Sequence, residues 1–233
     1  MSVEIEILED PARACAAMLL GAVLDGGDVV LTGGSTPRPA YEELGHALRA
    51  VGRDFGETTF WFGDDRCVPP EDERSNYRLV KETLLDPLAD LPAPAVKRIH
   101  GELGPQAAAE AYERELREAG EPEFDVLLLG LGPDGHTASL FPDQPSLNER
   151  SRLVVGVEHA GLEPFVPRVS LTLPALASAR QIVFLVTGES KADAVAAAFG
   201  PDAKPDPHVP ASMLVPLAKE LTVLLDPPAA RRL

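Results

Sequence analysis

The chain has 233 residues, with 21 Lys and Arg against 37 Asp and Glu, which gives a net charge of −16. This length leaves room for a substantial core, and a composition that is 45% hydrophobic and 25% charged excludes a disordered chain or a coiled coil. The negative charge argues against nucleic acid and anionic membrane surfaces as partners. With only Cys15 and Cys67, and an acidic start that lacks an apolar run, the sequence predicts a cytoplasmic, thiol-reduced protein with no membrane span.

Short apolar runs alternate with amphipathic segments, a pattern that predicts an α/β fold. We expect one domain over residues 1–233, with a mainly parallel Rossmann-like sheet, helices on both faces and a small accessory layer. In chain order the expected elements are strand 3–8, helix 11–24, strand 28–32, helix 37–51, strand 58–62, helix 76–85, strand 96–100, helix 106–119, strands 125–129, 153–157, 168–173 and 182–187, helix 190–199 and strand 222–226, with proline-marked loops at 91–95, 162–167 and 201–210. A monomer and a homodimer both remain open.

In a parallel sheet, ligands bind beyond the carboxyl ends of the strands, so the segments that follow the expected strands carry the candidate chemistry. The first reads LTGGSTP at residues 31–37. Gly33 and Gly34 let the backbone approach a ligand, and the N–H groups of the helix start, with Ser35 and Thr36, favour an anion such as a phosphate. The same residues also fit an ordinary capped helix start, so this segment alone leaves both interpretations open.

The second segment follows an aromatic strand and reads WFGDDR at residues 61–66, with SNY at 75–77. Asp64, Arg66 and Asn76 supply the carboxylate, guanidinium and amide groups that a polyhydroxyl ligand needs. The alternative is a solvated turn in which Arg66 pairs with an acid, a device that contributes only about 0–1 kcal/mol to stability.

The third segment reads GLGPDGHTASLFP at residues 130–142 and matches G-x-G-x-x-G literally. Dinucleotide binding does not explain it, because Asp134 would lie in the pyrophosphate loop and Pro133 removes an N–H donor. The segment instead presents Asp134 and His136 at the mouth of the sheet as a candidate acid/base pair. A solitary histidine is usually structural, but the glycines and the acid around His136 favour a function.

Two cations lie beside expected strand ends, Arg168 in PRVS and Lys191 in GESK. In an acidic chain they would form a local anion site. The alternatives are that Arg168 flanks a strand for solubility and that Lys191 lies in an exposed first helical turn. No zinc-ligand spacing or G-x-S-x-G elbow appears, and the sequence places no base beside Cys67, so we expect neither a metal nor a covalent nucleophile.

The three segments together, GGSTP, DDRCVP with SNY, and GLGPDGHTASLFP, resemble the motifs of the 6-phosphogluconolactonase family. The resemblance runs from Gly33 to Lys191. It implies an α/β fold shared with glucosamine-6-phosphate deaminases and hydrolysis of 6-phospho-D-glucono-1,5-lactone to 6-phosphogluconate, the second step of the oxidative pentose phosphate pathway, without a metal or another cofactor. The second acid of the DDR segment is commonly Glu in this family and is Asp65 here.

Two other functions remain as alternatives. A deaminase shares the glycine loop, the acid-rich loop and the D-G-H stretch, but its histidine is followed by A-F-N-E-P. Here Phe141 stands where that Glu would be, so the ring-opening relay lacks a member. A sugar-phosphate sensor without turnover is the second alternative, against which His136 and the lack of an attached DNA-binding segment both argue.

For a lactonase, we expect His136 to take a proton from the attacking water and then to give it to the ring oxygen. Asp134 would orient the imidazole or help to hold its charge. Arg66, or the N–H groups of Gly33 and Gly34, would stabilise the oxyanion.

For the phosphate, we expect Arg168 and Lys191 to supply the charge, with Ser35 as a further donor. Loss of either cation would then raise KM with little change in kcat. If neither mattered, the phosphate would lie elsewhere, on Arg66 or Arg38. The full set of expected substrate-binding residues is Gly33, Gly34, Ser35, Thr36, Asp64, Asn76, Arg168 and Lys191.

Overall fold

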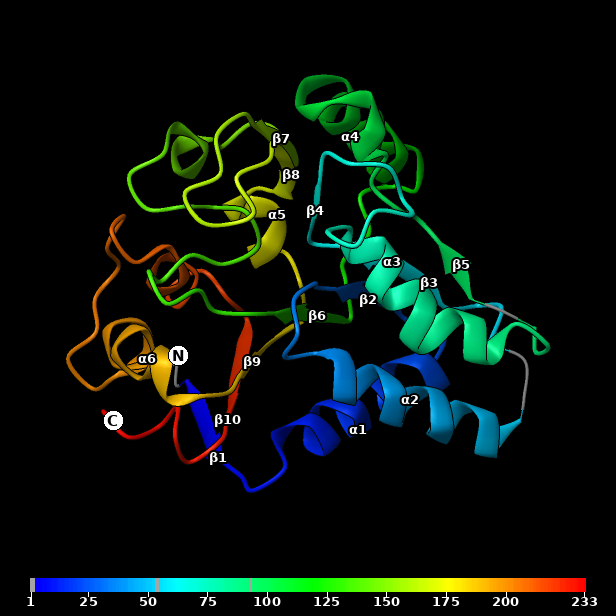
Figure 1. Cartoon of the computed structure of the whole chain (residues 1–233), viewed down its shortest axis with the longest axis horizontal. Helices are drawn as coiled ribbons and strands as arrows, with labels where there is room; N and C mark the ends of the chain where they lie inside the picture. Colours follow the sequence, from blue (N-terminus) through cyan, green and yellow to red (C-terminus); the bar gives the residue numbers. More distant parts are fainter. Residues whose placement is uncertain (1–2, 53–54, 93) are drawn as a thin grey trace.

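The computed structural model describes residues 3–52, 55–92 and 94–233, and its largest element is a seven-stranded parallel sheet (Figure 1). In spatial order its strands are β1 (Glu4–Ile7), β10 (Glu220–Leu225), β9 (Gln181–Val186), β6 (Val126–Leu129), β2 (Asp28–Leu31), β3 (Thr59–Phe62) and β5 (Ala95–Val96). All four residues of β6 are buried, which is typical of a parallel strand covered on both faces. Within the described ranges, no helix is long and apolar enough to cross a membrane.

Helices cover both faces of this sheet. The first helices, α1 (Pro11–Leu24) and α2 (Arg38–Val51), lie on one side, while α4 (Pro105–Glu118) and α6 (Ala192–Phe199) lie on the other (Figure 1). The shorter helical segments are α3 (Asn76–Val80), a π-helical turn at Lys81–Leu85, α5 (Leu173–Ala177), and 3₁₀ turns at Asp86–Leu88, Gly101–Leu103, Pro145–Asn148, Glu189–Lys191 and Pro210–Met213. The predicted fold class is therefore confirmed.

The accessory layer is a three-stranded antiparallel sheet formed by β4 (Asp64–Arg66), β8 (Arg168–Leu171) and β7 (Val154–Val157), with β8 in the middle. The sequence did not predict β4, because three charged residues that follow a glycine do not have the composition of a strand. Its pairing with β8 brings the DDR segment and the PRVS segment together, and this contact builds one wall of the site described below.

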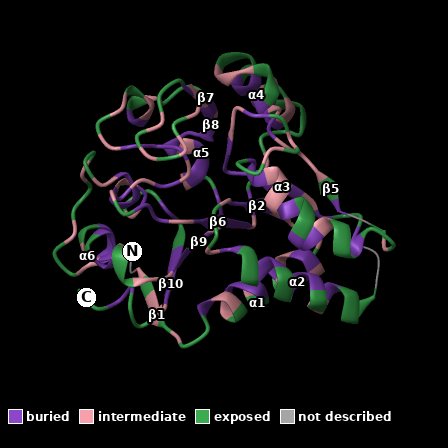
Figure 2. Ribbon diagram, in the orientation of Figure 1, coloured by how far each residue is buried: buried purple, intermediate pink, exposed green. Residues whose placement is uncertain are grey.

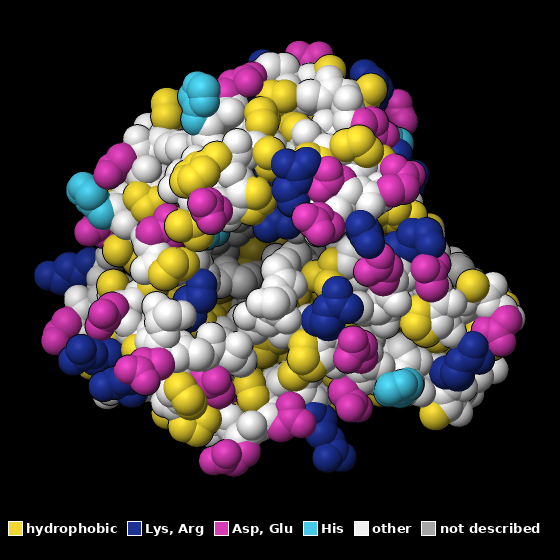
Figure 3. All heavy atoms as spheres, viewed as in Figure 1, with side chains coloured by type: hydrophobic (Ala, Val, Ile, Leu, Met, Phe, Trp, Pro, Cys, Tyr) yellow, Lys and Arg dark blue, Asp and Glu magenta, His cyan; other side chains and the backbone are white. Residues whose placement is uncertain are grey.

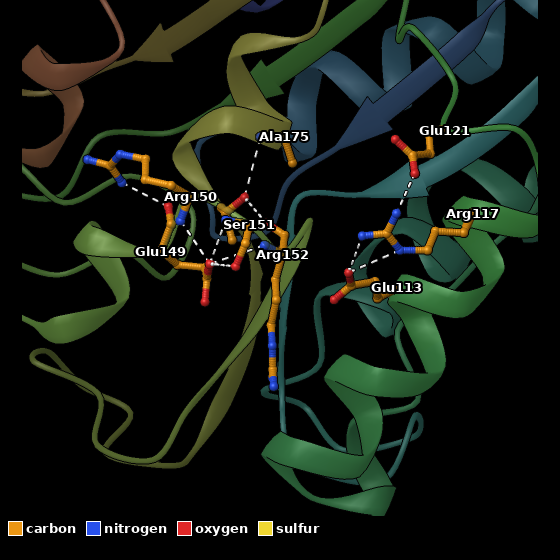
Figure 4. Close-up of polar contacts among 9 residues, drawn as sticks. Glu113, Arg117, Glu121, Glu149, Arg150, Ser151, Arg152 and Ala175 are labelled. Carbon is orange, nitrogen blue, oxygen red and sulfur yellow. Dashed lines mark hydrogen bonds and ion pairs between the residues drawn. The ribbon is translucent and has the colours of Figure 1, made fainter.

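Side-chain hydrogen bonds fix the ends of the small sheet (Figure 4). The Glu149 carboxylate accepts hydrogen bonds from the backbone N–H groups of Ser151 and Arg152 and from the Ser151 hydroxyl, and these bonds lower the pKa of Glu149 to about 2. The Thr172 hydroxyl donates to the carbonyl of Arg152 and accepts from the N–H of Ala175, which caps α5. The segment before β7 is thus tied to the segment after β8.

Most predicted elements agree with the structure within two residues, and the exceptions have physical causes. The strand predicted at 96–100 was wrong in extent, because β5 is a two-residue edge strand that pairs only with β3. The strand predicted at 168–173 ends at Leu171, since the Thr172 hydroxyl caps α5. The helix predicted at 76–85 changes to π-helical geometry after Val80. Residue 93, inside the loop predicted at 91–95, lies outside the described residues.

The core lies between the central strands and the helices, and it is visible as the buried interior of Figure 2. Trp61, Tyr41 and Tyr112 are its largest fully buried side chains. Each buried aromatic or aliphatic side chain contributes about 1.5–3 kcal/mol relative to an exposed one, so the layers are held mainly by apolar burial.

A crevice opens where the order of the strands reverses. The chain runs outward from β2 through β3 to β5 and in the opposite direction from β6 through β9 to β10. Strands β2 and β6 pair only at Val29 with Val126 and at Val30 with Leu127, and beyond these positions the two strands separate. Such a switch point at the carboxyl ends of parallel strands is where α/β proteins bind ligands.

Candidate active site

A pocket of about 260 Å³ lies at this switch point, walled by the segments that follow β2, β3, β6 and β9. Figure 3 shows the molecule hollowed near the middle of this face, with Lys and Arg side chains around the hollow. The lining residues are Thr32, Gly33, Gly34, Ser35, Thr36, Pro37, Asp64, Arg66, Asn76, Gly130, Leu131, Gly132, His136, Ala138, Leu162, Glu163, Arg168, Leu185 and Lys191. Every predicted site residue except Asp134 is among them, and Asp134 is hydrogen-bonded to one of them, His136.

His136 and Asp134 form a hydrogen-bonded pair. Nδ1 of His136 lies 2.5 Å from Oδ1 of Asp134, which also accepts the His136 backbone N–H at 3.2 Å. Burial raises the pKa of Asp134, but the hydrogen bonds and charge of His136 outweigh that effect, and the net pKa is lowered. Asp134 is therefore ionised at neutral pH and accepts a hydrogen bond from Nδ1–H, which leaves Nε2 of His136 as the basic nitrogen.

The turn that carries this pair requires glycine at two positions. A Cβ on Gly132 would lie 1.9 Å from Nδ1 of His136, so any side chain there would displace the imidazole. Gly135 has a φ of +81°, and a Cβ on it would meet Cγ1 of Val209 at 2.8 Å. The glycines of this motif therefore allow the imidazole and the carboxylate to meet in a tight turn, and they form no dinucleotide loop.

The glycine-rich segment after β2 forms the facing wall. Gly34 has a φ of +93°, and a Cβ on Gly33 would lie 1.7 Å from Oδ1 of Asn76, so this backbone and the Asn76 side chain are in close contact. Helix α2 starts without a side-chain cap, so the hydroxyls of Ser35 and Thr36 are not used in the way a capped helix start would use them. Both residues line the pocket.

The acid pair after β3 is buried and holds the walls of the pocket together. Oδ2 of Asp64 accepts from the Ser139 hydroxyl at 2.6 Å, and Oδ1 accepts from Nδ2 of Asn76 at 3.1 Å. Asp65 accepts from the backbone N–H groups of Arg66 and Asn76, both at 2.7 Å. Asp64 and Asp65 therefore connect the His136 segment, β4 and the start of α3, which a solvated turn would not do.

Three cations border the same space. Arg66 and Arg168 are opposite one another on the antiparallel strands β4 and β8, a placement that is unfavourable for like charges without an anion. The Nε atoms of both arginines are buried and have no hydrogen-bond partner in the described part of the chain. Burial lowers the pKa of Arg168 and of Lys191, although Asp134 raises the pKa of Lys191 in part. An anion in the pocket would stabilise this positive charge.

Arg168 also has contacts that the sequence did not indicate. Its Nη2 donates to the carbonyl oxygens of Leu162 at 3.0 Å and Pro164 at 3.1 Å. Its guanidinium lies 5.2 Å from the ring centroid of Phe141, and that ring lies 4.7 Å from the ring of His136. Arg168 therefore supports the pocket rim and the packing of the histidine, in addition to any contact with a ligand.

The sequence missed several residues of the site. Asp65 and Ser139 lie inside the recognised motifs, so their hydrogen-bonding role could have been proposed from their positions. Leu162 and Glu163 gave no local signal, because Arg168 and the fold bring their loop to the pocket. Arg38, the alternative phosphate ligand, lines a neighbouring hollow and lies 3.9 Å from Glu42. Among the described residues, no group of three or more His, Cys, Asp or Glu side chains could hold a metal ion.

Comparisons with known proteins agree with this geometry. The sequence model of the family described as glucosamine-6-phosphate isomerases/6-phosphogluconolactonase matches residues 8–223. The 6-phosphogluconolactonase of Streptomyces coelicolor is 40% identical over 205 residues, which cover 81% of this chain and 78% of the relative. The human 6-phosphogluconolactonase is 40% identical over 208 residues, which cover 87% of this chain and 79% of the relative.

Solved structures show the same architecture over the whole chain. The 6-phosphogluconolactonase of Trypanosoma cruzi aligns with a TM-score of 0.84 at 26% identity and covers 100% of this chain and 98% of the other. A monomeric glucosamine-6-phosphate deaminase aligns with a TM-score of 0.83 at 20% identity and covers 100% of both chains, a likeness of fold alone.

Proposed function

The chain belongs to the glucosamine-6-phosphate isomerase/6-phosphogluconolactonase family, and from this premise we propose that it hydrolyses 6-phosphogluconolactone to 6-phosphogluconate. The observation that carries the proposal is the His136–Asp134 pair beside a pocket bordered by Arg66, Arg168 and Lys191. Such a site combines a base for water with cations for a phosphorylated ester. We place this activity in the cytoplasm, in one domain, at the second step of the oxidative pentose phosphate pathway.

His136 is the general base of the proposed reaction. With Nδ1 bonded to the ionised Asp134, Nε2 takes a proton from a water molecule as the water oxygen forms a bond with the lactone carbonyl carbon. The imidazolium then gives this proton to the ring oxygen as the bond between that oxygen and the carbonyl carbon breaks. The product is a carboxylic acid, which ionises and releases a proton to solvent. These steps use no metal and no other cofactor.

The oxyanion and the phosphate need separate donors. The N–H groups of Gly33 and Gly34, or the guanidinium of Arg66, stabilise the negative charge that develops on the carbonyl oxygen, an effect that is commonly worth several kcal/mol. Lys191 and Arg168 bind the phosphate, with the Ser35 hydroxyl and the N–H groups of the helix start after Gly34 as further donors. In this assignment both ends of the substrate meet groups that line the pocket.

Phe141 argues against the deaminase as the function of this site. Its ring is 1% exposed and packs 4.7 Å from the ring of His136. This is the sequence position at which the deaminase motif has Glu, so the space beside the histidine is apolar here. No carboxylate at this position completes a relay with Asp134 and His136.

The proposal is tested by offering the purified protein freshly prepared 6-phosphogluconolactone and, separately, glucosamine 6-phosphate. Acid release in a pH-stat should exceed the spontaneous rate for the lactone, and no ammonia should form from the amino sugar. Ammonia release would support the deaminase instead. Tight binding of both compounds without turnover would support the sensor.

A further inference from the structure

A buried tyrosine hydroxyl forms hydrogen bonds with the backbone at the end of β2. The hydroxyl of Tyr41, a fully buried residue of α2, accepts the N–H of Thr32 at 2.9 Å and donates to the carbonyl oxygen of the same residue at 2.7 Å. Thr32 is the first residue after β2 and itself lines the pocket. One side chain thus satisfies both backbone groups at the point where the strand becomes the pocket wall.

The divergence of the sheet explains why these groups need a partner. Beyond Val30, β2 has separated from β6 to open the crevice, so Thr32 has no strand partner on that side. A buried backbone N–H or carbonyl without a partner costs free energy comparable to a lost hydrogen bond. The Tyr41 hydroxyl supplies the hydrogen-bond acceptor and donor that a neighbouring strand would otherwise supply.

The segment between Thr32 and Tyr41 contains the anion-binding loop, residues 33–36. It leaves the sheet at Thr32 and enters α2 one turn before Tyr41, so the hydroxyl joins the two ends of the loop. The N–H of Arg38, the first residue of α2, reaches the Ser35 carbonyl of the loop only at 3.4 Å, and Gly34 has a φ of +93°. The backbone of the loop is therefore held mainly at its ends.

We propose that Tyr41 is a positioning residue that keeps the anion-binding loop in the conformation that accepts the phosphorylated substrate, an inference that rests on the proposed lactonase function. Without the hydroxyl, the N–H and carbonyl of Thr32 are satisfied only if the segment shifts toward solvent, and the N–H groups of the loop move with it. The bound substrate restores the ordered conformation of the whole loop, including the N–H groups of Gly33 and Gly34, so the loss falls on substrate affinity and not on turnover at saturation.

Tyr112 provides a matched control. Its buried hydroxyl accepts the N–H of Phe62 at 2.8 Å and donates to the carbonyl of Phe62 at 3.1 Å, the same arrangement at the end of β3. The next residue, Gly63, is nevertheless held on both sides, because its N–H donates to Leu31 and its carbonyl accepts from Leu171. Removal of the Tyr112 hydroxyl therefore costs stability without freeing the wall of the pocket.

The experiment compares Tyr41→Phe with Tyr112→Phe, since both changes keep the ring and delete one hydroxyl. We expect similar decreases in Tm. Backbone hydrogen exchange over residues 32–36 should become about tenfold faster only in Tyr41→Phe, a change within the usual range of local coupling energies. In that variant the KM for 6-phosphogluconolactone should rise about tenfold with kcat within about twofold of the wild type, as a lowered population of the competent loop requires.

Added 6-phosphogluconate should restore slow exchange in Tyr41→Phe. Exchange and KM that match those of Tyr112→Phe would overturn the positioning role. A wild-type protein that hydrolyses no lactone would refute the proposed function alone, because the exchange comparison between the two variants does not depend on turnover.

Discussion

A replacement of Lys191 separates an effect on phosphate binding from an effect on the chemical step. Lys191 lines the pocket from the 3₁₀ turn Glu189–Lys191, which follows β9, and burial lowers its pKa, so its ammonium is less stable there than in water. A phosphate would offset that cost. Replacement by methionine keeps an unbranched side chain one atom shorter and removes the charge. A hydrogen bond to a charged group contributes about 1.5–3 kcal/mol, which corresponds to a rise of roughly 10- to 150-fold in KM for the phosphorylated lactone.

The assay measures steady-state hydrolysis of 6-phosphogluconolactone and of unphosphorylated gluconolactone by Lys191→Met. KM should rise only for the phosphorylated substrate, with kcat nearly unchanged, because the contact is equally strong in the ground state and the transition state. Lys204→Met, at an exposed lysine that does not line the pocket, should match the wild type on both substrates.

Arg168→Met should behave differently, because Arg168 also holds the carbonyls of Leu162 and Pro164 and packs on Phe141. We expect hydrolysis of both lactones to fall in this variant. If Lys191→Met lost activity equally on the two lactones, or lost none, the assignment of Lys191 to the phosphate would be refuted.

Asp134, Asp65 and the proposed metal independence are each open to a direct test. Asp134→Asn should lower kcat by up to roughly 10⁴-fold with little change in KM, because the imidazolium of His136 loses its anionic partner. An unchanged kcat in steady-state kinetics would show that Asp134 has only a packing role. Activity should survive dialysis against EDTA, and a loss that Zn²⁺ or Mg²⁺ reverses would reveal a metal requirement. Burial raises the pKa of Asp65 from 3.8 to about 6, so the folded state binds the proton more tightly than the unfolded chain. The stability that Asp65 contributes is thus complete below pH 3.8 and decreases as the pH rises through about 6. In urea titrations at pH 4 and pH 7, the wild type should lose about 2 kcal/mol more than Asp65→Asn, and equal losses would contradict the raised pKa.

The sequence predicted the fold class and most element bounds because apolar periodicity is strong in this chain. It failed where long-range pairing decides the local structure. Residues 64–66 become a strand only because β8 lies beside them, and β5 is short because the sheet ends there. Neither fact is encoded in the local residue pattern.

The candidate site was predictable as a set of motifs but not as a geometry. Glycines and polar residues after strands indicated which segments would meet, and the structure brings them to one pocket. Arg168 donates hydrogen bonds to the pocket rim and also packs on Phe141. Both contacts depend on side-chain positions across three segments. The hydrogen bonds between Tyr41 and Thr32 likewise join a helix to the end of a strand, and no spacing rule predicts them.

In the proposed reaction His136 is the base for lactone hydrolysis, and His136→Asn removes that base. Asparagine lacks a basic nitrogen but keeps a side chain that can hydrogen-bond to Asp134. With 6-phosphogluconolactone as substrate, the pH-stat rate at saturation should fall by roughly 10² to 10⁴-fold relative to the wild type, with an unchanged unfolding midpoint. A folded His136→Asn protein that hydrolyses the lactone at the wild-type rate would contradict the account.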